Sequence, residues 1–567
     1  MGCSVCALAQ KYFEKDIIIY NYFQNTQKIL PLENGNYIIQ AGTKDSQTDT
    51  WQSFALWLNP QLDTIGSKHL ILEGGDVHII DIIAVPSGYT LLIAIDSISG
   101  GYNWETFVMG LDTAGNELFF HAVGNPNYSD ICRRISYHPD GFYLLSGGAA
   151  LDGKTTPYII KLGAVGNKLW EQRFGYCIWR SEFRGQGFVL DENRYQFWGY
   201  YQLDTPDDGD WLMIETDSMG NFVRDTTYHP YEPNDDTAAM FNPIQNADKS
   251  IVFVGMVEYL DNVTAKIDST GNIVWISDNL FGGGGAWEVV ALDDGRYIVG
   301  GTMNHDDGIA ELDARMVMLS ADGEVQWVRD YGNTLYDYGY AIAKTPDKGF
   351  LMAGRGYLAD INTISIYLVK TNCMGLLTEP QAAFTAYQTG DSPLEVGFQN
   401  LSQYVYPDSI DGGYYVWDFG DGSPPFMCGQ GYGACPALVT HNYAAQGQYT
   451  ATLTAFVCTD TATAAQQFSV VPTAVGQVAA PRYHISVLPN PATGVLHLEA
   501  VGVLPAPQEL QFSLYDAMGR TVRRLALRAN AGSVRLGIAD LPQGLYFWTC
   551  YSPDMVLQSG RVVIGSE

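Results

Sequence analysis

The sequence predicts an all-β protein of three successive units, and three observations support this. A turn-and-strand pattern recurs about every fifty residues through the first two thirds of the chain. No lysine follows Lys370, and residues 371–480 contain neither lysine nor arginine, whereas arginine returns from Arg482 onward. Short runs that alternate apolar and polar residues, bounded by Gly, Pro and Asp turns, continue to the C-terminus. We therefore place unit boundaries near residues 375 and 480.

Each repeat of the first unit begins with a turn and a strand that ends in a small residue, as in Asp294-Gly-Arg-Tyr-Ile-Val-Gly-Gly301. Its second half is an apolar strand, an Asp-x-x-Gly-Asn turn and a strand with tryptophan, as in Ile267-Asp-Ser-Thr-Gly-Asn-Ile-Val-Trp275. The first halves end at Gly42, Ala94, Gly147, Gly199, Gly255, Gly301 and Gly354. Four short strands at this period are typical of a β-propeller. Residues 10–378 are therefore predicted to form a seven-bladed β-propeller with tryptophan packed between blades.

The last repeat lacks a full outer strand, because only Leu376-Leu377 separates its turn from Glu379-Pro380. An unassigned strand, Asp16-Ile-Ile-Ile-Tyr20, precedes the first repeat. We predict that this N-terminal strand completes the last blade and closes the ring.

Composition excludes some classes of partner. The chain has 62 acidic and 31 basic residues, a net charge of −31, which repels phosphate backbones and argues against nucleic-acid binding. No apolar run is long enough to predict a transmembrane segment. Residues 1–9 end in Ala7-Leu8-Ala9, an A-x-A cleavage pattern, so we interpret them as the remnant of a signal peptide whose start is truncated or misassigned.

Residues 379–473 are predicted to form an immunoglobulin-like sandwich of about six strands. The motif Trp417-Asp-Phe-Gly-Asp-Gly422, followed by His441-Asn-Tyr443, resembles the polycystic-kidney-disease (PKD) domain. That resemblance implies a spacer or a module that contacts protein or glycan. We interpret Asp418 and Asp421 as turn-forming residues. Cys428 and Cys435 flank a Gly-rich loop and are the best disulfide candidate.

After a linker at 474–484, residues 485–567 are predicted to form a small antiparallel β-sandwich. Its ordered motifs include Pro489, Asn490, Pro491, Gly519, Gly544 and Tyr546. Together they resemble the C-terminal sorting domain of type IX secretion cargo in Gram-negative bacteria. The resemblance implies contact with the type IX machinery, export across the outer membrane, and a secreted or surface-displayed protein.

No His-Glu-x-x-His, nucleophile elbow or P-loop is present, so the sequence predicts no catalytic residue. Acidic clusters do occur in the repeat loops: Asp207, Asp208, Asp210, Asp306 and Asp307. We interpret these clusters as acidic loops exposed to solvent. Calcium is the one cofactor that such a set of oxygen ligands suggests. A pair of catalytic carboxylates across a cleft stays open as a third reading.

Aromatic residues beside hydrogen-bonding groups fall where one repeat connects to the next. The candidate ligand-binding residues are Tyr128, Trp179, Arg180, Trp287, Tyr336 and Tyr338. They predict either a ligand face for an extracellular glycan or protein, or packing between blades. The sequence therefore favours a non-enzymatic binding or adhesion protein on the cell surface. The alternative is a secreted propeller enzyme, a glycoside hydrolase or lyase, that acts on polysaccharide through loop carboxylates.

Overall fold

The structure is a computed structural model, and every regular element in the part of the chain that it describes is a β-strand. It describes residues 12–18, 24–44, 50–71, 75–96, 104–151, 154–175, 180–202, 209–228, 238–257, 261–304, 312–332, 336–358, 363–389, 392, 394–407, 411–471, 483–490, 492–502, 509–516, 520–528, 534–551 and 556–565.

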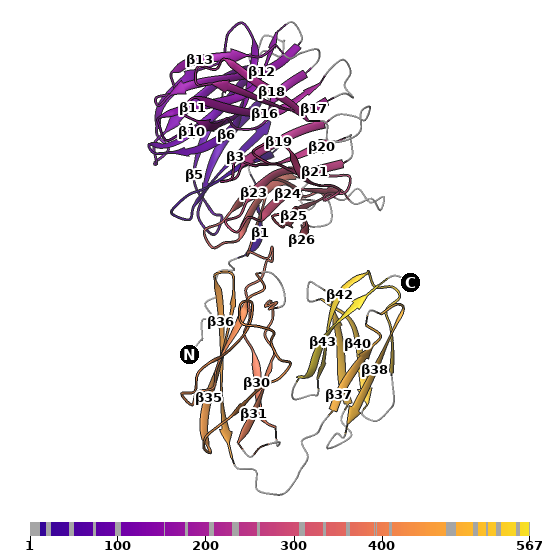
Figure 1. Cartoon of the computed structure of the whole chain (residues 1–567). Helices are drawn as coiled ribbons and strands as arrows, with labels where there is room; N and C mark the ends of the chain where they lie inside the picture. Colours follow the sequence, from indigo (N-terminus) through magenta and orange to yellow (C-terminus); the bar gives the residue numbers. More distant parts are fainter. Residues whose placement is uncertain are drawn as a thin grey trace.

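The first unit consists of antiparallel sheets of consecutive strands, which we call blades and number in chain order (Figure 1). Blade 1 contains β2 (Gln24–Pro31), β3 (Tyr37–Lys44), β4 (Trp51–Leu58) and β5 (Thr64–Leu70), and blade 2 contains β6 (Asp76–Val85), β7 (Gly88–Asp96), β8 (Trp104–Leu111) and β9 (Glu117–Ala122). Blade 3 contains β10 (Ser129–His138), β11 (Phe142–Leu151), β12 (Lys154–Gly163) and β13 (Lys168–Arg173). Blade 4 contains β14 (Arg180–Phe183), β15 (Phe188–Asp191), β16 (Arg194–Gln202), β17 (Gly209–Asp217) and β18 (Phe222–Tyr228).

Three further blades complete this unit. Blade 5 contains β19 (Ala238–Gln245), β20 (Ile251–Val257), β21 (Asp261–Ile267) and β22 (Ile273–Ser277). Blade 6 contains β23 (Gly285–Ala291), β24 (Tyr297–Asn304), β25 (Leu312–Leu319) and β26 (Val325–Tyr331). Blade 7 contains β27 (Tyr338–Lys344), β28 (Phe350–Leu358), β29 (Thr363–Thr371) and the N-terminal β1 (Phe13–Ile17).

Blades 3 and 4 share one nine-stranded sheet, joined by a single parallel pairing of Thr155 with Arg180. We divide the sheet at that pairing because each half repeats the strand order of the other blades. The count of seven rests on this division and stays an interpretation. Each neighbouring pair of blades shares a core of buried apolar side chains, and the core of blades 7 and 1 closes the circle. The unit is therefore a β-propeller whose blades bury their faces on one another.

The Asp-x-x-Gly turns fold locally for a clear reason. In the turn at residues 112–116, Asp112 Oδ1 accepts hydrogen bonds from the backbone amides of Ala114 (2.9 Å) and Asn116 (2.8 Å). Gly115 has φ = +85°, a conformation that glycine adopts without steric cost. The same arrangement recurs at Asp217 and Asp268. These turns set the register of the third and fourth strand of each blade.

The predicted closure by the N-terminal strand is confirmed. β1 pairs antiparallel with β29, Phe13 lying opposite Lys370 and Ile17 opposite Ile366, so the strand begins three residues earlier than expected. Two lysines extend the contact to blade 1. Lys15 Nζ lies 2.6 Å from Asp63 Oδ1, and Lys370 Nζ donates to the carbonyl of Pro60 at 2.9 Å.

The second unit, which we call the middle sandwich, has two packed sheets. One contains β30 (Phe384–Gln388), β31 (Glu395–Asn400) and β34 (Val439–Asn442), and the other contains β33 (Phe426–Gly429), β32 (Tyr414–Asp418), β35 (Gly447–Val457) and β36 (Asp460–Val470). Trp417 is fully buried in its core and meets Phe384 edge-on at 5.3 Å. The predicted disulfide between Cys428 and Cys435 is present.

The middle sandwich is fastened to blade 7, which the sequence did not predict. A second disulfide joins Cys373, in the turn after β29, to Cys458, in the β35–β36 hairpin. Tyr12, directly before β1, donates a hydrogen bond to Asp460 at 2.6 Å. Thr459 Oγ1 donates to the carbonyl of Asp347 at 2.9 Å. The hairpin therefore contacts three segments at one end of the ring-closing blade, so the middle sandwich is more than a spacer.

The third unit, the tail sandwich, also has two sheets. One contains β37 (Tyr483–Leu488), β38 (Val495–Gly502) and β41 (Val534–Gly537), and the other contains β40 (Thr521–Arg528), β39 (Glu509–Tyr515), β42 (Gly544–Tyr551) and β43 (Val556–Ile564). Asn490 fastens the first strand to the last, since it donates to Arg561 O (3.2 Å) and accepts from Val563 N (2.9 Å). Tyr546 donates to Pro542 O at 2.8 Å. Pro491 and Gly519 lie outside the described residues.

The interdomain disulfide is expected to stabilise the protein more than the local one. Cys373 and Cys458 are 85 residues apart, whereas Cys428 and Cys435 are 7 apart. On the chain-entropy account, closing the longer loop contributes about 4.5 kcal/mol and the shorter about 2.5 kcal/mol. Calorimetry should therefore show a larger drop in melting temperature for C373S/C458S than for C428S/C435S. An equal or smaller drop would contradict the larger stabilising effect expected of the disulfide between Cys373 and Cys458.

The acid stability of the middle sandwich should depend on Asp421. Its carboxylate lies 2.7 Å from His441 Nε2 and accepts hydrogen bonds from Ser423. Burial raises the pKa of Asp421, but the hydrogen bonds from Ser423 and His441 outweigh it and hold the pKa at about 2.

Because the folded pKa lies below the unfolded value of about 3.9, the stabilisation is full above that pH and is lost as pH falls toward 2. Urea denaturation at pH 7, 4 and 2.5 should show that Asp421→Asn is destabilised at pH 7 and that its deficit shrinks on acidification. A deficit independent of pH would refute this assignment.

Candidate functional site

The innermost strands of the blades carry bulges that set up the centre of the propeller. The register of the first strand against the second shifts in blades 1, 2, 3, 5, 6 and 7. The residue skipped by the shift is Arg133 in β10, Trp287 in β23 and Tyr340 in β27. A bulge re-aims a side chain out of the sheet plane, so these positions can meet groups from other blades.

A partly buried lysine links several blades near the centre. Lys28 Nζ of blade 1 lies 3.1 Å from Glu288 Oε1 of blade 6 and 4.0 Å from Asp81 Oδ1 of blade 2. Glu288 accepts the amide of Ile342 in blade 7 at 2.9 Å, and Asp81 accepts that of Ile135 in blade 3 at 3.2 Å. Burial lowers the pKa of Lys28, but the two carboxylates outweigh it and raise the pKa overall, so the amine stays charged. We call Lys28, Asp81 and Glu288 the central ion cluster.

A third carboxylate, in blade 4, is paired with cations. Glu182, almost fully buried, lies 3.3 Å from Arg133 Nε and pairs with Arg184. It also accepts the hydroxyl of Tyr200 at 3.0 Å. Arg184 in turn lies over the ring of Phe241, 5.6 Å from its centre. Glu182 is thus engaged by cations and a phenol, which leaves it poorly suited to accept a substrate proton.

Replacing Lys28 should test the central ion cluster. Lys28→Met leaves Glu288 and Asp81 as uncompensated buried charges, so the free energy of unfolding should fall by about 3 kcal/mol. The exposed Lys154→Met is the matched control and should change it by less than about 0.5 kcal/mol. Urea denaturation followed by tryptophan fluorescence measures both. Equal stability of the two variants would show that the cluster does not hold the blades together.

Two of the predicted ligand residues, Trp287 and Tyr338, belong to one aromatic group. Trp287 lies 6.0 Å from Tyr340, which stacks on Tyr338 at 5.6 Å. The guanidinium of Arg355 covers the ring of Tyr338 at 4.1 Å. Tyr336, 37 % exposed, instead packs edge-on against Tyr357 at 6.4 Å. We call Trp287, Tyr338, Tyr340 and Arg355 the aromatic wall.

The structure corrects the expected position of several candidates. Trp287 and Tyr338 lie on the inner strands β23 and β27, not in connections between blades. Tyr128 packs edge-on against Tyr158 at 6.3 Å, with Arg173 over its ring, inside blade 3. Trp179 lies outside the described residues, and of Arg180 only the strand β14 is described.

Tyr340 and Arg355 were not predicted from the sequence, and neither was a second aromatic group. Tyr340 follows Tyr338 by two residues, the same-face spacing of a strand, which could have indicated it. In the second group His78 lies between Trp51, at 5.5 Å, and Trp104, at 5.3 Å. Burial lowers the pKa of His78 and favours the neutral imidazole.

The described residues give no support to a metal site. Asp210 accepts the hydroxyl of Tyr201 at 2.9 Å and is buried. Asp207, Asp208, Asp306 and Asp307 lie outside the described residues. Within the described ranges, no group of three His, Cys, Asp or Glu side chains could hold an ion.

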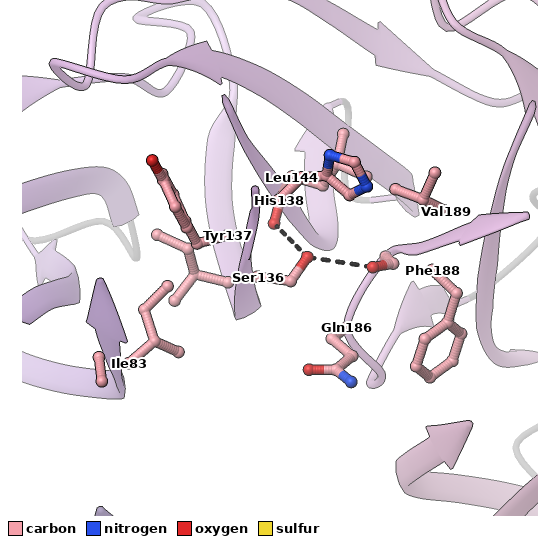
Figure 2. Close-up of a pocket in the computed structure, with 11 residues that line it drawn as sticks. Ile83, Ser136, Tyr137, His138, Leu144, Gln186, Phe188 and Val189 are labelled. Carbon is pink, nitrogen blue, oxygen red and sulfur yellow. Dashed lines mark hydrogen bonds between the residues drawn. The ribbon is translucent and has the colours of Figure 1, made fainter. Parts of the chain in front are cut away.

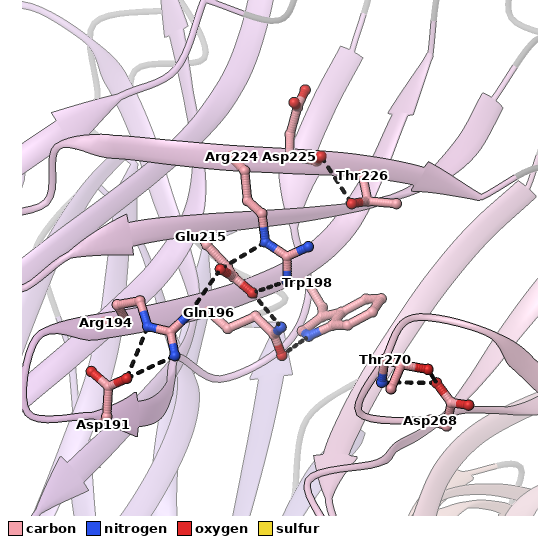
Figure 3. Close-up of polar contacts among 10 residues, drawn as sticks. All are labelled: Asp191, Arg194, Gln196, Trp198, Glu215, Arg224, Asp225, Thr226, Asp268 and Thr270. Atoms are coloured by element: carbon pink, nitrogen blue, oxygen red, sulfur yellow. Dashed lines mark hydrogen bonds and ion pairs between the residues drawn. The ribbon is translucent and has the colours of Figure 1, made fainter.

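Two cavities in the propeller are lined by residues outside these aromatic groups. The first, of about 430 Å³, lies where β6 and β10 end, next to the segment that leads into β15 (Figure 2). Ser136 donates to the carbonyl of Gly187 at 3.0 Å there, and His138 stacks on Phe142 at 4.8 Å. The second cavity, of about 280 Å³, lies between blades 4 and 5 beside Arg224 and Glu215 (Figure 3).

The two C-terminal units each match a known domain family. Residues 486–564 match the family of secretion system C-terminal sorting domains, and residues 378–471 match the PKD domain family. The tail marks this chain as type IX secretion cargo. The tail sandwich therefore interacts with the type IX machinery, and the protein is carried to the cell surface or extracellular space. Among the described residues, no helix is long and apolar enough to cross a membrane.

Solved structures resemble separate parts of the chain. The PKD1 domain of the Vibrio cholerae metalloprotease PrtV is 28 % identical and covers 17 % of this chain and 99 % of its own, with a TM-score of 0.12. The β-propeller domain of the Trilobed protease from Pyrococcus furiosus is 9 % identical and covers 64 % and 97 %, with a TM-score of 0.37. A protein of unknown function from Dyadobacter fermentans is 11 % identical and covers 63 % and 97 %, with a TM-score of 0.35. No curated protein matches the sequence.

Proposed function

We propose that this protein is a non-enzymatic binding or adhesion protein, which the type IX system displays on the cell surface or releases. Its propeller binds a glycan or protein ligand, and its middle sandwich sets the position of the propeller. The sorting tail accounts for export.

The aromatic wall is the observation that carries this proposal. Trp287, Tyr340 and Tyr338 form a continuous series of rings, and Arg355 covers the last of them. Half-buried rings next to a cation offer apolar area together with hydrogen-bond donors. Sugar rings and aromatic-rich protein surfaces both require this combination.

The carboxylates of the described region favour binding over catalysis. Glycoside hydrolysis needs one carboxylic acid and one carboxylate facing the same bond. Asp81 and Glu288 instead share Lys28, and Glu182 is paired with two arginines. No contact among the described residues favours the alternative of an enzyme that acts through loop carboxylates, and that alternative stays a hypothesis.

A glycan array and a panel of extracellular matrix proteins, both probed with the purified protein, test the proposal. Tyr338→Ala removes the ring beneath Arg355 and should weaken any ligand found by about tenfold, the equivalent of about 1.4 kcal/mol. Tyr338→Phe keeps the ring and should retain binding. Tyr387→Ala removes a tyrosine of the middle sandwich that is 47 % exposed, and should have no effect.

Trp287→Ala should also weaken binding, with melting curves used to confirm that the variant is folded. Binding that survives both Tyr338→Ala and Trp287→Ala would show that the ligand does not use the aromatic wall. Turnover of a polysaccharide by the purified protein would contradict the non-enzymatic proposal itself.

A further inference from the structure

Most neighbouring blades are joined by an aromatic ring that lies on a glycine turn. The ring belongs to the last strand of one blade, and the glycine ends the four-residue turn after the third strand of the next blade. A Cβ atom built on Gly220 would lie 2.8 Å from the Trp170 ring. The corresponding distance is 2.6 Å from Gly323 to Trp275, and 2.8 Å from Gly375 to Trp327. These rings occupy the space that only a glycine leaves free.

The docked indole also makes a specific hydrogen bond. Trp170 Nε1 donates to the carbonyl of Ser218 at 3.3 Å, and Trp275 Nε1 donates to the carbonyl of Ala321 at 3.0 Å. Both acceptors are the second residue of the turn that receives the ring. The glycine has no side chain, so the face of the ring can pack on it. The hydrogen bond from the indole N–H to a backbone carbonyl then orients the ring.

Blade 4 departs from this pattern. The aromatic residue stands four positions after the turn glycine in blades 3, 5 and 6, and the equivalent position after Gly220 is Arg224. Arg224 turns toward its own blade, donating to Glu215 at 2.8 and 2.5 Å (Figure 3). A Cβ atom on Gly271, the glycine of the next turn, would meet only the Tyr228 hydroxyl, at 3.2 Å.

The second cavity occupies the place of the absent ring. Its lining includes Arg224, Glu215 and Thr226 on one side and the turn from Asp268 to Gly271 on the other. Trp198, stacked on Tyr228 at 5.5 Å, forms a further wall, and its indole N–H is bound by Gln196. The volume of about 280 Å³ is near the lower end of the ~300–1,000 Å³ that small-molecule sites occupy, so one ring system fits.

We propose that this slot, bounded by Arg224, Trp198 and the turn at Gly271, binds a planar aromatic group supplied from outside the chain. The ring lies on Gly271 as Trp275 lies on Gly323 in the next blade pair. An N–H of the ring donates to the carbonyl of Ser269, the second residue of this turn. The guanidinium of Arg224 approaches the ring as that of Arg329 approaches Trp327, at 5.5 Å.

This site is separate from the aromatic wall and does not rest on the function proposed for it. The group is either a small aromatic molecule or an aromatic side chain of a peptide, since both present the same ring. Indole and N-acetyltryptophanamide distinguish the two sources, because only the latter carries flanking peptide groups. Cyclohexanol supplies an aliphatic ring of similar size.

Titration of the full chain with the three probes, followed by calorimetry and ligand-detected NMR, tests the proposal. Both indole probes should bind, and cyclohexanol should bind at least about tenfold more weakly. Tighter binding of indole indicates the free molecule, and tighter binding of the amide indicates a peptide side chain. Absence of binding by either indole probe at about 10 mM, or equal binding of cyclohexanol, overturns the proposal.

Two variants refill the slot by different routes. E215Q/R224W restores an aromatic residue at the docking position without leaving Glu215 charged, and Thr226→Phe places a ring in the cavity while keeping the Arg224–Glu215 pair. Each should reduce indole binding at least about tenfold. Thr227→Phe, the exposed neighbouring position, is the control and should bind as the unmodified protein does. Unchanged binding in Thr226→Phe places the ring elsewhere and overturns the proposal.

Discussion

The pairing of β1 with β29 is the interaction on which the propeller depends. Every blade buries its faces on two neighbours, so an incomplete last blade would expose an edge and leave the core between blades 7 and 1 open. At this junction lysines replace the docked ring, since Lys15 reaches Asp63 and Lys370 reaches Pro60. The closing contact therefore adds lysine contacts to a shared apolar core. The disulfide from Cys373 and the hydrogen bond from Tyr12 then tie the same blade to the middle sandwich.

Local chemistry explains what could be predicted from the sequence. The Asp-x-x-Gly turns, the missing strand of the last repeat and the disulfide between Cys428 and Cys435 are all set by residues close together in the chain. Apart from the closure by the N-terminal strand, which the incomplete last repeat indicated, contacts between distant segments could not be predicted in this way. The disulfide from Cys373 to Cys458 spans two units, and Trp287, which was expected in a loop, lies at a bulge of the inner strand β23. Repeat alignment could have indicated Arg224, but only the structure shows that the space it vacates is open.

Closure also determines how the centre can be used. The closed ring brings Lys28, Asp81 and Glu288 together from distant positions in the sequence. Their charges pair with one another and link the blades that carry them. Chemical function is then left to groups that closure does not need. Two such places are present. The aromatic wall has Trp287 and Tyr338 on inner strands, and the slot at Arg224 lies between blades 4 and 5. Export by the tail places both where extracellular ligands are available.

Hydrogen exchange of the blade 7 amides tests the closed ring most directly. β29 lies between β28 and β1, so its amides should all exchange slowly in the full chain. Removal of residues 1–18 should accelerate exchange in β29 and extend the loss of protection to blade 1 through their shared core. Unaltered protection in β29 and blade 1 after this truncation would contradict the account.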